Sequence, residues 1–237
     1  MSKQMHPSST KYAAVFLLLS LSGMWLAWAV NSPAAWLLIG WAVAAFALVG
    51  AAYACRQPGW LGKRRDGSIA TTQAIVLLPY RLLSEASFTL VRLFSARAAW
   101  CEVQPGLFWG RRLTAGESSS LHVDGILDLT AEFPASTSTG GEARTLVPML
   151  DGTAPSPAGL ATAVQALTDH LASGSAYVHC AMGHGRSGLV VAAYLLGQQD
   201  DARSDDVIAE LRKLRPGFSL SPGQRSLLGR FDQSNAH

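Results

Sequence analysis

Cys180 and Arg186 lie on either side of five residues in a glycine-containing segment that could carry phosphate chemistry. A cysteine thiolate is a strong nucleophile, and a guanidinium grips two oxygens of one phosphate. Two glycines between them allow a tight loop with its backbone N–H groups turned inward. The predicted phosphate-binding residues are Ala181, Met182, Gly183, His184, Gly185 and Arg186. The spacing therefore predicts an oxyanion site in which Cys180 attacks phosphorus.

Two regular elements must position this loop. An apolar strand over Ala176–His179 precedes it, and an apolar helix over about Arg186–Gln199 follows it. The helix is apolar nearly all round, so we expect it to be buried. Its N-terminus adds a positive dipole and unpaired N–H donors, which favour a thiolate and a bound phosphate.

Asp151 is the candidate for the proton transfers that the reaction needs. A leaving oxygen must be protonated, and a water must later be deprotonated. Asp151 follows the predicted strand Thr145–Pro148 and lies 29 residues before Cys180. A helix over about Pro157–Ala172 would return the chain to the loop. The alternative is an Asp that only forms a turn with Gly152.

The segment of His179-Cys180, five residues and Arg186-Ser187 resembles the H-C-x5-R-[ST] signature of protein tyrosine and dual-specificity phosphatases. Four other segments resemble parts of dual-specificity domains: Gln104–Arg112, Gly125–Pro134, Arg215–Phe218, and Gln224 with Leu228. The likeness covers roughly residues 100–232. It implies that Ser187 helps the thiolate depart, that His179 orients the loop, and that no metal or cofactor is needed.

The same resemblance bears on Asp151. The Asp-Gly-Thr-Ala-Pro wording is similar to the D-G-x-P-P acid loop of the regenerating-liver phosphatases, shifted by one residue. Two related enzyme classes fit less well. Rhodanese-type loops commonly have four residues after the cysteine, and low-molecular-weight phosphatases place the cysteine near the start and the acid late.

The pattern of residues 99–237 predicts an α/β domain, because short apolar runs alternate with helical patterns. The remaining strands are expected at Trp100–Val103, Leu107–Trp109 and Ile126–Leu129. Helix starts are expected at Ser156-Pro157, at Ser204 and at Ser221-Pro222. The fold class is thus a protein tyrosine phosphatase-like domain with a central, mainly parallel sheet flanked by helices, preceded by a two-helix transmembrane hairpin.

The hairpin is predicted in residues 1–55. Tyr12–Val30 and Ala34–Cys55 contain no charge and are each long enough to cross a bilayer. Basic residues flank both ends and are absent from the turn, so both ends are expected in the cytoplasm. Two alternatives are a buried soluble hairpin and a signal peptide cleaved after Ala29. The predicted protein is therefore an integral membrane protein with a cytoplasmic catalytic domain. The combination of hairpin and catalytic domain resembles membrane-attached bacterial members of the phosphatase family, which implies the bacterial inner membrane.

Residues 56–98 form a predicted juxtamembrane linker, basic at Lys63-Arg64-Arg65 and then amphipathic. Pro79 ends any preceding helix, and Tyr80–Ala98 could form a helix. It could lie in the membrane interface or pack on the catalytic domain.

Charge is divided between the two halves. Residues 1–100 carry nine basic and two acidic residues, a net charge of +7, whereas residues 101–237 carry a net charge of −4. The acidic half argues against nucleic acid as a partner. Three cysteines do not make a disulfide framework, and Cys101 is interpreted as structural.

The leading hypothesis is a membrane-anchored phosphatase for phosphotyrosine, phosphoserine and phosphothreonine proteins. Membrane lipid is also a predicted partner. One alternative is therefore a phospholipid phosphatase of the phosphatidylglycerophosphate type, because membrane tethering would raise the local concentration of lipid substrates. The loop has no Lys or Arg before Arg186. Phosphoinositide phosphatases of the family it resembles often carry Lys there, so this weakens the case for a polyphosphoinositide substrate. The other alternative is a catalytically silent, phosphate-binding membrane adaptor. The sequence allows two positions for the His184 side chain, facing solvent or contacting substrate.

Overall fold

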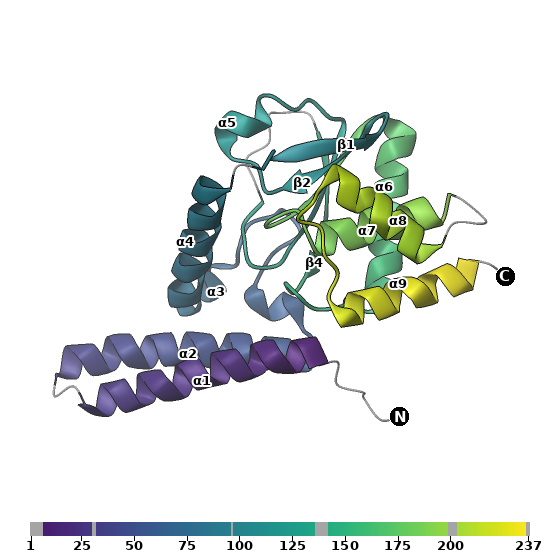
Figure 1. The fold of residues 1–237 in the computed structure, drawn as a ribbon. Helices are drawn as coiled ribbons and strands as arrows, with labels where there is room; N and C mark the ends of the chain where they lie inside the picture. Colours follow the sequence, from purple (N-terminus) through teal and green to yellow (C-terminus); the bar gives the residue numbers. More distant parts are fainter. Residues whose placement is uncertain (1–6, 30–31, 96, 136–141, 199–202, 236–237) are drawn as a thin grey trace. The chain divides into compact units, whose positions relative to one another are not determined.

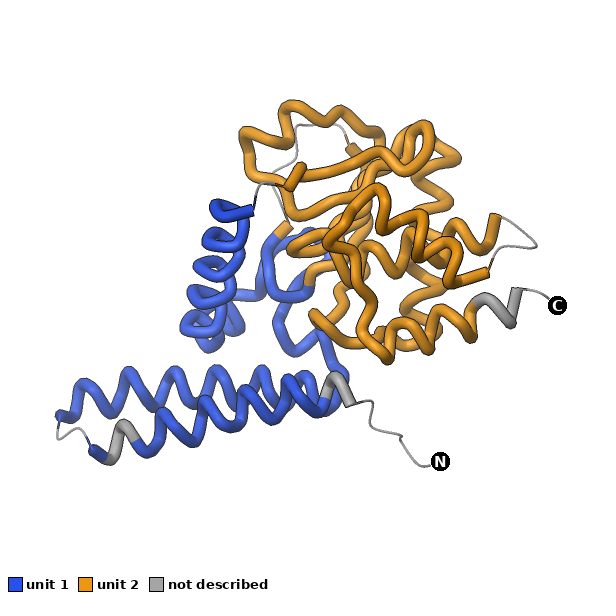
Figure 2. Tube along the Cα trace, viewed as in Figure 1, with its two compact units in different colours: residues 1–95, 131–134 blue, residues 96–130, 135–237 orange. Residues whose placement is uncertain are grey.

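The structure is a computed structural model that describes residues 7–29, 32–95, 97–135, 142–198 and 203–235. Its chain falls into two compact units, coloured separately in Figure 2. Unit 1 comprises residues 1–95 and 131–134, and unit 2 comprises residues 96–130 and 135–237.

The regular elements of unit 1 are helices, with one isolated β-bridge between Lys63 and Ile69 among its described residues. Its elements are α1 (Pro7–Ala29), α2 (Pro33–Cys55), the 3-10 helix η1 (Pro58–Leu61), α3 (Thr71–Val76) and α4 (Leu78–Phe94).

The first two helices pack side by side in opposite directions (Figure 1). Phe16 stacks on Phe46 with 6.1 Å between ring centroids, and Tyr12 lies 5.4 Å from Tyr53. Among the described residues, α2 is the one helix long and apolar enough to cross a membrane, with a mean hydropathy of 2.1. The first predicted span ends at Val30, outside the described residues, so two spans remain a prediction.

The predicted linker helix forms, but its end differs. It runs over Leu78–Phe94, with Pro79 in its first turn, where a missing N–H costs nothing. The prediction that it continues to Ala98 is wrong. The carbonyl of Ala98 accepts from Arg215, and that of Ala99 accepts from the Arg111 N–H at 2.9 Å, so these residues lead into a strand instead.

Unit 2 contains a five-stranded sheet and the helices that cover it. The strands are β1 (Trp100–Gln104), β2 (Leu107–Arg111), β3 (Gly125–Thr130), β4 (Ala143–Met149) and β5 (Ala176–Cys180). The helices are α5 (Ala115–Ser118), α6 (Pro157–Ser173), α7 (Arg186–Leu196), α8 (Ser204–Leu214) and α9 (Pro222–Asn235).

The sheet is mixed, in the order β1-β2-β5-β3-β4. β1 runs antiparallel to β2, and the other pairs are parallel. β5 therefore lies at the centre, and each of its residues is buried. This agrees with the predicted α/β fold with a mainly parallel sheet.

Alternate residues of β5 serve two apolar clusters, as a strand buried on both faces requires. Val178 and Cys180 join the main core with the fully buried residues of α7. Tyr177 points into a smaller cluster with Leu113, Leu121 and Ile126.

Predicted helix starts agree closely with the structure. Ser156 caps α6 by accepting from the Gly159 N–H at 3.0 Å, and Ser221 accepts from the Gln224 N–H at 3.3 Å. Ser204 is not a cap, because it is already the first residue of α8 and Arg203 occupies the cap position. α7 ends at Leu196, and its predicted end, Gln199, lies outside the described residues.

Candidate active site

The candidate nucleophile stands at the junction of the central strand and the buried helix. β5 ends at Cys180, the loop occupies residues 181–185, and α7 begins at Arg186. Gly183 has φ +70° and lies against the carbonyl of Gly110, so a side chain there would be strained and would clash. The loop therefore owes its shape to glycine at this position.

The Cys180 sulfur has a hydroxyl neighbour. Cys180 is 2% exposed, and its Sγ lies 3.3 Å from Ser187 Oγ. The indole Nε1 of Trp109, which can only donate, contacts the same oxygen at 3.1 Å. The Ser187 oxygen thus accepts from Trp109, so the hydrogen of the Ser187 hydroxyl is available to donate to the Cys180 sulfur.

Arg186 is fully buried and its guanidinium is anchored at the candidate acid loop. Nη1 donates to the Met149 carbonyl at 2.9 Å, and Nη2 pairs with Asp151 Oδ1 at 3.1 Å. The Asp151 side chain is 61% exposed. The structure thus brings the predicted acid and the predicted phosphate-binding arginine together, as expected.

The backbone of the loop offers donors. Among the hydrogen bonds of the described residues, none is donated by the N–H groups of residues 182–185. The loop is tied to β2 by its carbonyl instead, since Ala181 O accepts from the Arg112 N–H at 3.0 Å. Met182 is half-buried. Four N–H groups beside a buried thiol make an arrangement suited to an oxyanion.

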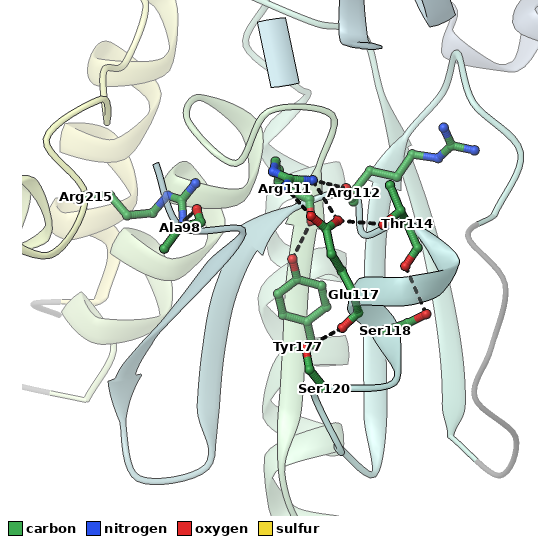
Figure 3. Close-up of polar contacts among 9 residues, drawn as sticks. All are labelled: Ala98, Arg111, Arg112, Thr114, Glu117, Ser118, Ser120, Tyr177 and Arg215. Carbon is green, nitrogen blue, oxygen red and sulfur yellow. Dashed lines mark hydrogen bonds and ion pairs between the residues drawn. The ribbon is translucent and has the colours of Figure 1, made fainter. Parts of the chain in front are cut away.

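Polar contacts link the strands next to the loop, and Figure 3 shows those made by Arg111, Glu117 and Tyr177. The Tyr177 hydroxyl donates to the Arg111 carbonyl, and Tyr177 stacks on His179 with 5.5 Å between ring centroids. His179 is 1% exposed, and its Nδ1 lies 3.3 Å from the Cys180 carbonyl. Burial raises the pKa of Tyr177 well above its usual value, so its hydroxyl keeps its proton.

Arg111 also holds a carboxylate. It pairs with Glu117, with 2.6 Å between Nη2 and Oε1, and Glu117 accepts from the Thr114 N–H at 3.0 Å. Partial burial would raise the pKa of Glu117, but the hydrogen bonds from Arg111 and Thr114 and the charge of Arg111 lower it to about 2. The register places Arg111 beside Cys180, so this pair braces the strand next to the nucleophile.

His184 is half-buried and lies against a cation that the sequence did not suggest. Its Nε2 is 3.3 Å from Nη1 of Arg97. The prediction left open whether His184 faces solvent or contacts substrate, and this contact was not among the readings. Nothing in the sequence links two residues that are 87 positions apart.

Gln224 was also missed as a site residue. It is 1% exposed, its Nε2 donates to the Thr153 carbonyl at 3.0 Å, and its Oε1 accepts from the Ser221 N–H at 3.0 Å. This side chain ties the loop that carries Asp151 to the start of α9. The Ser221-Pro222 pattern predicted the start of α9 but not the contact between Gln224 and the Asp151 loop.

Cys101 and Cys180 are both free thiols, and Cys101 Sγ contacts the Trp109 carbonyl at 3.6 Å. This fits the structural interpretation of Cys101. Within the described ranges, no group of three or more His, Cys, Asp and Glu side chains is arranged to hold a metal ion.

Comparison with known proteins agrees with this geometry. The model of the dual specificity phosphatase catalytic domain matches residues 109–234, which is more than half of the chain. Structures of similar fold include PTPMT1 in complex with PI(5)P, at 23% identity and a TM-score of 0.52, over 58% of this chain and 97% of that one.

Two human proteins share the fold. DUSP28 is 23% identical, with a TM-score of 0.50, over 56% of this chain and 95% of its own. The tyrosine phosphatase-like serine/threonine/tyrosine-interacting protein is 18% identical, with a TM-score of 0.53, over 60% of this chain and 100% of its own. At these identities the likeness shows the fold alone.

Proposed function

Because this chain belongs to the dual-specificity phosphatase family, we propose that it is a membrane-anchored phosphatase that hydrolyses phosphomonoesters through a phosphocysteine intermediate. The observation that carries the proposal is the 3.3 Å contact of Cys180 Sγ with Ser187 Oγ, one residue after the buried Arg186. A nucleophile, a hydroxyl donor and a guanidinium meet at one helix N-terminus.

In the first step, the Cys180 thiolate attacks phosphorus in line with the leaving oxygen. The S–P bond forms, the P–O bond breaks, and protonated Asp151 gives its proton to the leaving oxygen. The N–H groups of residues 181–186 and the Arg186 guanidinium bind the equatorial oxygens. A bound phosphate would compete with Asp151 for the Arg186 guanidinium, which pairs with Asp151 in this structure.

In the second step, Asp151 takes a proton from water, and the resulting hydroxide attacks phosphorus. The S–P bond breaks and inorganic phosphate leaves. The Ser187 hydroxyl donates to the departing thiolate, a role that its bond from Trp109 supports. His179 orients the loop from beneath.

Two substrate classes are candidates. Phosphotyrosine, phosphoserine and phosphothreonine proteins follow from the family resemblance. A phospholipid of the phosphatidylglycerophosphate type is favoured by α2, an apolar helix that could hold the enzyme at a lipid surface. The PTPMT1 complex with PI(5)P is a similar fold bound to a phospholipid.

We also propose the division into a two-span hairpin (residues 1–55), a juxtamembrane linker (56–98) and a catalytic domain (99–237), with the last in the cytoplasm at a bacterial inner membrane. The boundary of the two compact units near residue 95 supports the separation of the linker from the catalytic domain. The outer face of α4 supports a linker on the membrane, because Leu82, Leu90, Leu93 and Phe94 are all exposed there.

The test is phosphate release by the detergent-solubilised full chain. Phosphopeptides and phosphatidylglycerophosphate serve as substrates, and Cys180→Ser is the matched variant that lacks the nucleophile. We expect release by the native chain and none above background by Cys180→Ser. Asp151→Asn should slow phosphate release from substrates with poor leaving groups far more than from p-nitrophenyl phosphate. The p-nitrophenolate that leaves the latter needs little protonation.

Equal release by both proteins would overturn the mechanism. No release by the native chain, with phosphate binding retained, would favour the silent adaptor. An unaffected Asp151→Asn would remove only the assignment of the acid.

A further inference from the structure

Arg97 brings a cation to the phosphate loop from outside it. Its Nη1 lies 3.3 Å from Nε2 of His184, the residue two positions before Arg186. Gly217 makes the approach possible, since a Cβ at this position would stand 2.5 Å from the His184 ring and 2.8 Å from the Arg97 guanidinium carbon. Three segments distant in sequence therefore meet at one rim of the loop.

The contact defines which of the two side chains carries the charge. A guanidinium can only donate, so Nε2 of His184 must accept and the ring must be neutral. Burial lowers the pKa of His184 to about 4, helped by the charges of Arg215 and Arg97 and opposed by that of Asp151. At neutral pH, His184 is thus an uncharged hydrogen-bond acceptor for Arg97, and the positive charge at this rim belongs to Arg97.

The backbone beside Arg97 is fixed to the site, although the Arg97 residue itself is exposed. Arg215, which is 6% exposed and lies over the Trp109 ring at 5.6 Å, donates to the Ala98 carbonyl at 3.4 Å (Figure 3). The next residue, Ala99, accepts from the Arg111 N–H. Trp109 in turn contacts Ser187, so the same structure that holds the nucleophile also holds this segment.

A cation with a fixed base and an accessible head suits an anionic group of a ligand. In the proposed mechanism Arg186 and the loop N–H groups bind the reacting phosphate, and Arg97 adds a separate positive charge at the rim of the loop. The guanidinium fork matches phosphate oxygens. No Lys or Arg lies in the loop before Arg186, so Arg97 supplies from the chain before β1 a charge that the loop sequence lacks.

We propose that Arg97, seated on His184, is a second anion site, and that the substrate is a phosphomonoester whose alcohol also carries the phosphodiester of a lipid headgroup. The inference rests on the proposed phosphatase function. The lipid is preferred to a doubly phosphorylated peptide because α2 and the exposed apolar face of α4 belong to the same chain. A short polyol between the two phosphates would let one substrate reach both sites.

The experiment compares substrates with one and two phosphates on the full chain in detergent. The first is p-nitrophenyl phosphate, and the second is a short-chain phosphatidylglycerophosphate. Arg97→Ala should lower the ratio of kcat/KM for the second over the first about tenfold or more, as expected when a charge-assisted hydrogen bond is lost. Arg97→Lys, which keeps the charge without the fork, should lose less.

Arg212→Ala is the matched control, because Arg212 is an exposed arginine on α8. Its ratio should equal that of the native chain. A peptide with phosphotyrosine and phosphothreonine forms the third arm, and thermal unfolding verifies that each variant is folded.

The outcomes separate the two proposals. A native ratio in Arg97→Ala, with the native chain active on both substrates, overturns the second anion site. A loss confined to the doubly phosphorylated peptide overturns the lipid assignment. Failure of the proposed function looks different: the native chain would then release no more phosphate than Cys180→Ser from any substrate, and the inference would fall with it.

Discussion

At the scale of single residues, the site works through groups that can act in only one way. Trp109 can only donate, so it turns the Ser187 hydroxyl toward Cys180. The Met149 carbonyl can only accept, so it holds one arm of the buried Arg186 guanidinium. Such constraints preorganise the charges that a phosphoryl transfer needs, at no cost during the reaction.

Ser187→Ala tests the hydroxyl. We expect breakdown of the phosphocysteine to slow about 10- to 100-fold, the effect of losing a hydrogen bond to a charged group. Rapid mixing with p-nitrophenyl phosphate should then give a burst of p-nitrophenol followed by slow turnover. Ser226→Ala, an exposed serine on α9, should behave like the native chain. A slowed burst with no change in steady turnover would contradict the assignment.

The Arg111–Glu117 pair makes a pH-dependent contribution to stability. Because the folded pKa of Glu117 is about 2, below its usual 4.5, its stabilisation is present above pH 4.5 and disappears as the pH falls toward 2. Glu117→Gln should therefore lower Tm at pH 7 and converge with the native chain toward pH 2. Thermal unfolding in detergent across this range measures the difference. A constant difference at all pH values would be inconsistent with the pair.

At the scale of elements, connection and sheet order bring the acid to the nucleophile. The chain leaves β4 toward Asp151, passes through α6 and returns to β5, crossing β3. The carboxyl ends of these parallel strands meet at one edge of the sheet, where the ligands of open α/β sheets bind. Asp151 and Arg186 thus pair at 3.1 Å although 35 positions separate them.

The outer face of α4 gives the second element-level prediction. Leu82, Leu90 and Leu93 are exposed, and Phe94 is 86% exposed, whereas Tyr80 and Phe88 are buried on the opposite side. An exposed apolar helix face in a chain that also carries α2 is expected to lie in lipid.

A polarity-sensitive probe at Leu90→Cys, with the native cysteines replaced by Ser, should move into an apolar environment in vesicles. Spin-labelled lipids should quench it. The same probe at Glu102→Cys, an exposed site on β1, should stay in water. Equal water exposure of both probes would show that α4 does not enter the membrane.

At the scale of the whole molecule, the proposed function places the hairpin of unit 1 in the lipid bilayer and unit 2 in water. Unit 1 contains the apolar α2 and α1, which pack through aromatic rings. Unit 2 contains the sheet, its own apolar core and all of the candidate site residues. A tether of this kind would raise the concentration of membrane substrates around the site.

Topology is the corresponding test. The basic residues at both ends of the hairpin predict that the N-terminus and the catalytic unit share the cytoplasmic side. In inverted inner-membrane vesicles, N- and C-terminal tags should both be open to protease. A cysteine at Ser32 should react with an impermeant reagent only from the other side. Tags on opposite sides would rule out the two-span hairpin.

The sequence determined the parts of this protein that are local. The Cys180–Ser187 segment, the helix starts at Pro157 and Pro222 and the central strands are encoded by residues next to one another. Hydrophobic period, caps and a contiguous motif therefore located them to within a few positions. The apolar run of α2 needed only its length and composition.

The residues that complete the site from distant parts of the sequence became evident from the packed fold. The contacts of Arg97 with His184 and of Gln224 with Thr153 join residues 87 and 71 positions apart. Neither follows from spacing, because each depends on the strand order and on how the segments pack around β5. The early end of α4 has the same cause, since hydrogen bonds from Arg215 and Arg111 draw residues 98–99 out of the helix and into the sheet unit.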